Sequence, residues 1–68
     1  MINHFNIRTI DGQIYRFYTE DIYNLNFDYA PELIRFDFKD GSFIEFYKRN
    51  VMYVEAIAES DEKKRKEQ

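Results

Sequence analysis

The sequence predicts an all-β protein, a small, twisted antiparallel sheet or barrel of five to six strands built from two similar β-hairpin units. Apolar and polar residues alternate with a period of two over residues 34–38, which is typical of a strand with one buried face. Asp-Gly pairs at 11–12 and 40–41 indicate hairpin turns. The stretches that begin at these pairs, 11–22 and 40–51, align without a gap, so the hairpins repeat.

The register of the second hairpin depends on the length of its turn. A two-residue loop would set Phe36 opposite Glu45 and would place a carboxylate in the apolar layer. A three-residue loop ending at Gly41 instead sets Phe36 opposite Ile44 and leaves Arg35 facing Glu45 on the other side. Because this register separates apolar from charged residues, we expect the bulged loop, with Gly41 at positive φ.

The same loop gives a consistent register in the first hairpin, where Phe5 pairs with Phe17 and Ile7 with Tyr15. We interpret the chain as an internal duplication. The alternative is that two unrelated hairpins with this restricted set of residue types resemble each other by chance. The expected organisation is a single β domain over residues 1–58, with duplicated units 2–27 and 32–58, followed by a charged tail over 59–68.

The first unit begins with strands expected over residues 2–9 and 13–19, followed by a polar break. Residues 22–27 are either a third strand or an irregular connector, because Asn24 and Asn26 have poor strand propensity. Pro31, which has no amide hydrogen, separates the two units.

The end of the second unit leaves two interpretations open. Residues 51–57 are expected to form the last strand, and the alternative is a helix capped by Asn50. In the tail, acidic residues precede basic ones by four positions, a spacing that favours a solvated helix.

Length and composition restrict the function. A chain of 68 residues forms one domain and buries only about 60% of its unfolded surface, so its stability should be marginal unless it oligomerises. Its seven Phe and six Tyr are one way to supply buried apolar area. There is no cysteine, which fits a reducing compartment. Neither a membrane span of ~20 apolar residues nor a secretory signal is evident. We therefore expect a cytoplasmic protein without membrane contact.

The charge distribution argues against nucleic acid as a partner. Four of the ten basic residues stand together at Lys63, Lys64, Arg65 and Lys66. Without this cluster and Glu67, six basic residues remain against twelve acidic ones. A body with this balance repels phosphate backbones on average.

No catalytic, cofactor or metal-binding constellation stands out. His4 is the only imidazole, and we interpret it as a surface residue of an edge strand rather than as a catalytic base. Asp37, Asp40 and Gly41 superficially resemble a calcium loop, but Phe36 and Phe38 stand at the required ligand positions before Asp40. The sequence therefore predicts a protein that is not an enzyme and has no cofactor or metal.

Two surfaces remain as candidates for contacts. The first is a protein interface of outward-facing apolar residues, unless other strands cover them: Ile14, Tyr18, Leu33, Phe43 and Tyr47. The second combines Arg8 and Arg16 with Tyr18, as single-stranded nucleic-acid binders do, although ordinary cross-strand packing explains it better.

We therefore expect a non-enzymatic protein-interaction module, a small accessory or inhibitory protein that self-associates as a homodimer. Its partners would be proteins, a second copy of the chain included. A weak single-stranded nucleic-acid binder is the alternative, which we consider less favoured because the body of the chain is acidic.

Overall fold

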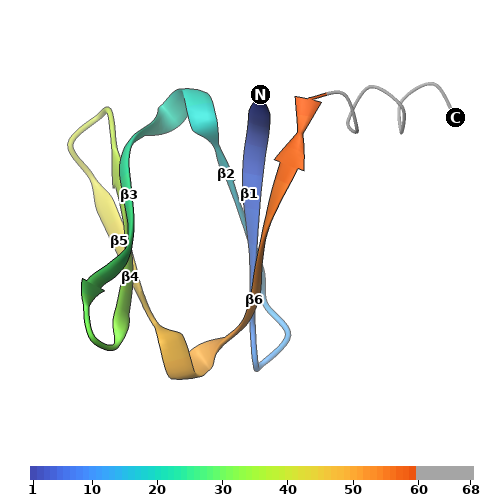
Figure 1. Cartoon of the computed structure of the whole chain (residues 1–68), viewed down its shortest axis with the longest axis vertical. Coiled ribbons are helices and arrows are strands. Elements are labelled where there is room, and N and C mark those ends of the chain that lie inside the picture. The colour runs from blue at the N-terminus through green and yellow to red at the C-terminus, as the bar shows by residue number, and fades with distance from the viewer. Residues whose placement is uncertain (60–68) are drawn as a thin grey trace, which may run out of the picture.

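The computed structural model describes residues 1–59 and shows two three-stranded antiparallel sheets (Figure 1). The strands are β1 (Ile2–Thr9), β2 (Ile14–Tyr18), β3 (Ile22–Ala30), β4 (Leu33–Phe38), β5 (Phe43–Tyr47) and β6 (Val51–Ala58). The all-β fold class is confirmed, and residues 51–57 form a strand rather than a helix. The expected helix of the tail falls on residues 60–68 and lies outside the described part of the chain.

Each hairpin takes its third strand from the other unit. The first sheet has the strand order β2-β1-β6 and the second has the order β3-β4-β5. Two short 3-10 helices, η1 (Thr19–Asp21) and η2 (Lys48–Asn50), carry the chain between the sheets at opposite ends of the molecule (Figure 1). Because an isolated two-stranded hairpin is only marginally stable, this exchange of strands makes each unit depend on the other.

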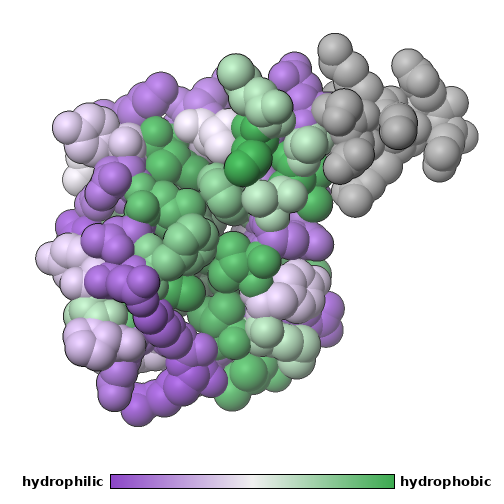
Figure 2. Space-filling view, viewed as in Figure 1, coloured by the Kyte–Doolittle hydropathy of each residue, from purple (hydrophilic) through white to green (hydrophobic). Residues whose placement is uncertain are grey.

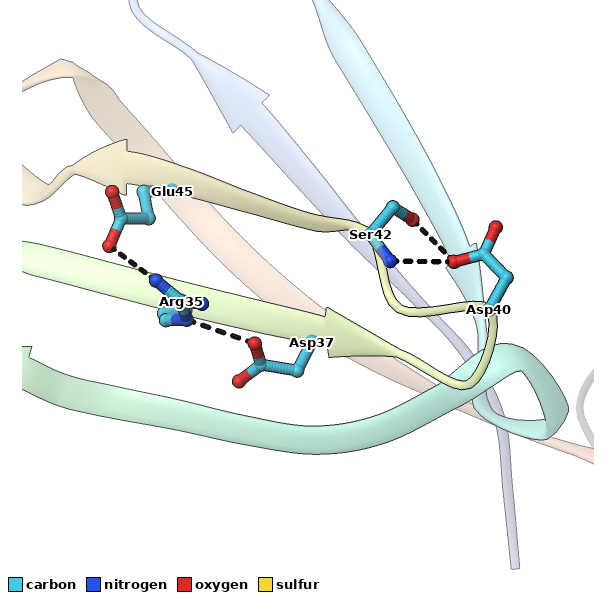
Figure 3. A network of polar contacts seen from close by, with 5 residues as sticks. All are labelled: Arg35, Asp37, Asp40, Ser42 and Glu45. Carbon is cyan, nitrogen blue, oxygen red and sulfur yellow. Dashed lines mark hydrogen bonds and ion pairs between the residues drawn. The ribbon is translucent and has the colours of Figure 1, made fainter.

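The hairpin turns have the predicted bulged geometry. Gly41 has a φ of 93°, its N–H donates to the carbonyl of Phe38 (3.0 Å), and the Phe38 N–H donates to the carbonyl of Ser42 (2.9 Å). The hydroxyl and amide of Ser42 both donate to the Asp40 carboxylate, at 2.6 and 2.9 Å (Figure 3). These two hydrogen bonds lower the pKa of Asp40, because they stabilise the ionised carboxylate.

The predicted registers are also confirmed, and they produce one apolar layer between the sheets. Phe36 opposes Ile44 and Phe5 opposes Phe17, so these side chains share the inner faces. The buried centre of the core consists of Ile7, Ile34, Phe36 and Phe46. Figure 2 shows hydrophobic residues gathered in a band between the sheets, so this small core reaches the surface on the side shown.

Aromatic contacts across the core show which strands face one another. The ring of Tyr15 on β2 lies 5.2 Å from that of Phe46 on β5, and Phe17 lies 6.2 Å from Phe46, measured between ring centroids. Phe17 also lies 4.8 Å from Phe36 on β4. Strand β2 therefore lies across the core from β5, and these two edge strands border the same side of the molecule.

The four edge strands differ in regularity. The pairing of β3 with β4 is shifted at Tyr23 and again between Asn26 and Ala30, and the pairing of β6 with β1 is shifted at Met52. In contrast, the pairings of β2 with β1 and of β5 with β4 run without a shift. Bulges protect a sheet edge from further pairing, so β2 and β5 are the unprotected edges.

The expectation that His4 is exposed on an edge strand is wrong. Strand β1 is the middle strand of its sheet, and His4 is fully buried between Tyr18 on β2 and Ile57 on β6. Its Nδ1 lies 2.9 Å from the side-chain amide nitrogen of Asn3. Strand β1 is a middle strand because β6 pairs with it from the far end of the chain.

Candidate protein-interaction surface

The structure distributes the five predicted interface residues over two faces. Ile14 and Tyr18 are exposed on the outer face of the β2-β1-β6 sheet. Phe43 and Tyr47 are exposed on the outer face of the β3-β4-β5 sheet, next to half-buried Leu33. Since the sheets pack through their inner faces, the two groups lie on opposite sides of one chain.

The second group is the more developed surface, and we call it the aromatic face: Tyr29, Leu33, Arg35, Phe43 and Tyr47. Arg35 is its organising residue. The guanidinium carbon lies 3.9 Å from the centroid of the Phe43 ring and 4.8 Å from that of Tyr29, so the cation is held between two aromatic rings.

Two carboxylates hold this guanidinium in place from the same face. Arg35 Nε donates to Asp37 (3.0 Å), and a terminal nitrogen donates to Glu45 (3.1 Å), as Figure 3 shows. The pair with Glu45 follows from the hairpin register, which sets the two residues directly opposite each other. The aromatic face is therefore preorganised, and the charges of Asp37 and Glu45 are balanced by Arg35 and by Arg49, which lies over the Tyr47 ring.

A shallow pocket lies at one end of the aromatic face. Leu33 and Tyr47 oppose each other in the register, and together with Ala30, Pro31 and Glu32 they line a volume of about 280 Å³. The lining is mainly apolar at the β3–β4 turn. Such a pocket beside exposed aromatic rings is able to receive an apolar side chain of a partner.

Sequence reasoning missed Tyr29 as a member of this face. We expected the third strand to end at residue 27, whereas β3 continues to Ala30 and carries Tyr29 over Arg35. Asp28 and the two asparagines in this strand weakened the strand signal. The available signal was the alternation of Phe27 and Tyr29 with polar residues.

The second predicted surface is brought together on the outer face of the β2-β1-β6 sheet. Arg16 and Tyr18 are exposed and Arg8 is half-buried. Arg16 Nε donates to the side-chain oxygen of Asn6 (3.2 Å), and the Asn6 amide donates to Glu55 (3.0 Å). Glu55 was not part of the predicted surface, and from the edge strand β6 it adds a carboxylate to this face.

Among residues 1–59, no cluster of His, Asp and Glu side chains is arranged to hold a metal ion. No helix within the described residues is long and apolar enough to cross a membrane. The chain matches no protein-family model, no curated protein and no solved structure.

Proposed function

We propose that this chain is a cytoplasmic, non-enzymatic protein-interaction module that self-associates and acts as a small accessory or inhibitory protein. The observation that carries the proposal is the aromatic face. Phe43 and Tyr47 are 54% and 49% exposed there, on strand β5, whose pairing with β4 fixes their positions. Aromatic residues and arginine are the types that contribute most to protein interfaces.

The environment of these aromatic residues supports a protein partner. Their rings lie on a paired sheet and Arg35 is already fixed by Asp37 and Glu45, so little conformational entropy is lost on binding. Apolar contacts dominate the exposed area, and association through them depends weakly on salt.

Solution mass tests this proposal. We expect the mass of the wild type, measured by light scattering on size exclusion, to increase with protein concentration. The Phe43→Glu variant should remain monomeric with an unchanged circular dichroism spectrum, because a desolvated carboxylate opposes burial of this face. Tyr23→Glu is the matched control, since Tyr23 is 78% exposed on a bulge of β3 outside the aromatic face.

The controls also define how the proposal fails. A wild-type chain that is monomeric at every concentration would contradict self-association. Equal loss of association in Phe43→Glu and Tyr23→Glu would contradict a specific role for the aromatic face.

The alternative function, weak binding of single-stranded nucleic acid through Arg8, Arg16 and Tyr18, has less support. Arg16 is hydrogen-bonded to Asn6, and Glu55 adds a negative charge to the same network. Binding that falls steeply with salt and is weakened by Arg16→Ala would favour this alternative.

A further inference from the structure

Among residues 1–59, no strand pairs with the outer edge of β2, which carries a regular row of backbone groups. In an antiparallel ladder, residues that exchange backbone hydrogen bonds with the partner strand alternate with residues that do not. Thr9 donates to the carbonyl of Gln13 (2.9 Å), which fixes the phase of this alternation in the β1–β2 ladder. The backbone groups of Tyr15 and Phe17 therefore face β1, and those of Ile14, Arg16 and Tyr18 face outward.

Strand β5 has the same arrangement on the other sheet. The Phe38 N–H donates to the carbonyl of Ser42, so the same phase applies to the β4–β5 ladder. The outward-facing backbone groups of β5 belong to Phe43, Glu45 and Tyr47. These residues also point their side chains to the outer face.

From these edges we propose that two copies of the chain form a dimer in which β2 of each copy pairs antiparallel with β5 of the other. The inference rests on the proposed function, because it specifies how the module self-associates. Strands β2 and β5 border the same side of each copy, so one twofold-related copy reaches both edges at once. Each three-stranded sheet then continues into a sheet of the second copy, and no unprotected edge remains.

Charge determines which edges pair. The outward-facing backbone groups of β2 and β5 form hydrogen bonds in a register that aligns the middle residues of the two strands. In this register, Arg16 of one copy lies opposite Glu45 of the other. Pairing β2 with β2 would place Arg16 against Arg16, and pairing β5 with β5 would place Glu45 against Glu45. Opposite charges stabilise directly opposed cross-strand positions and like charges destabilise them, so the β2–β5 pairing is favoured.

The side chains in this register also match. On the outer face Ile14 opposes Tyr47 and Tyr18 opposes Phe43 of the second copy. The dimer thus unites on one continuous sheet face the apolar residues that a single chain holds on opposite sides. On the inner face Tyr15 opposes Phe46 of the second copy, which extends the core across the interface.

Charge reversal tests the proposed pairing. Arg16→Glu and Glu45→Arg each place like charges opposite one another at both strand pairs, and each should weaken dimerisation by about tenfold. An equimolar mixture of the two variants should restore it, because the mixed dimer has opposite charges at both positions. Sedimentation equilibrium measures the affinities, and circular dichroism verifies the fold of each variant.

The single variants separate this pairing from its competitors. A dimer formed only through the aromatic face would not respond to Arg16→Glu, because Arg16 lies on the opposite side of the chain. Single variants that associate as tightly as the wild type, or a mixture that associates no better than either variant, would overturn the proposed pairing.

Amide hydrogen exchange gives a second test that needs no substitution. The outward-facing amides of Arg16 and Glu45 should exchange rapidly in dilute protein and become protected as the concentration rises. If the mass doubles while these amides stay unprotected, the edge pairing is overturned and the proposed function stands. If the mass does not change with concentration, the edge pairing and the self-association in the proposed function both fail.

Discussion

Gly41 is the residue that allows the second hairpin to close. Its φ of 93° lies in a region where a Cβ is unfavourable, but a Cβ added there would have no atom within 4 Å. We therefore expect Gly41→Ala to lower the free energy of unfolding by about 1 kcal/mol through backbone strain alone. Urea denaturation measures the change.

Gly12 provides the matched position, because it has a φ of 91° and the same open surroundings. Gly12→Ala should cost about as much as Gly41→Ala, and Gly41→Asn should cost less because asparagine tolerates positive φ better than alanine. An alanine variant with wild-type stability at either position would contradict the strain argument.

Individual residues were predictable where their surroundings are local in the chain. The conformation of Gly41 follows from a choice between two loop lengths, and the alternation of nearby apolar and charged residues decides it. The position of His4 on a middle strand was not predictable in this way, because β1 pairs with β6 from the far end of the chain. Local pattern gives no information on which distant strand pairs with a given edge.

At the level of elements, Arg35 joins β4 to both of its neighbours on the aromatic face. It contacts Tyr29 on β3 and Phe43 and Glu45 on β5. Arg35→Met keeps most of the side-chain volume and removes the charge, so Asp37 and Glu45 lose their shared cation. We expect a loss of about 1 kcal/mol in the free energy of unfolding, measured by urea denaturation.

Arg49 is the control for this substitution. Its guanidinium carbon lies 5.0 Å from the centroid of the Tyr47 ring, and it forms no ion pair within the described residues. Arg49→Met should therefore change the stability by less than about 0.5 kcal/mol. Equal losses in the two variants would show that Arg35 does not organise the aromatic face.

The pairing within each hairpin was predictable, and the partner of each third strand was not. The β4–β5 register follows from the length of the hairpin loop and from the alternating residues on either side of it. The polar residues of β3 have poor strand propensity, and pairing with β4 overrides this preference.

For the candidate site, the outward orientation of Phe43 and Ile14 was predictable from alternation. Their placement on opposite sides depends on how the sheets stack.

At the level of the whole molecule, the two units hold each other together in a similar way at both ends. The first hairpin turn contacts η2 through Ile10, whose N–H donates to the carbonyl of Asn50 (2.9 Å). The second hairpin turn contacts η1 through Lys39, whose N–H donates to the carbonyl of Asp21 (3.0 Å). In the alignment of the two units that matches Gly12 with Gly41, the donor Ile10 matches Lys39 and the acceptor Asn50 matches Asp21. The internal repeat therefore extends to the contacts between the units.

This interdependence predicts how the chain behaves when it is divided at Pro31, which is exposed in the turn between β3 and β4. Fragments 1–30 and 31–68 each contain one hairpin and one strand that belongs to the other sheet. Each fragment alone should lack a cooperative thermal transition at low concentration, because a hairpin without its third strand is marginal. An equimolar mixture should recover the circular dichroism spectrum and the thermal transition of the intact chain. A fragment that unfolds cooperatively as a monomer would show that the exchanged strands are dispensable, and the two units would then be separate folding units joined by a linker.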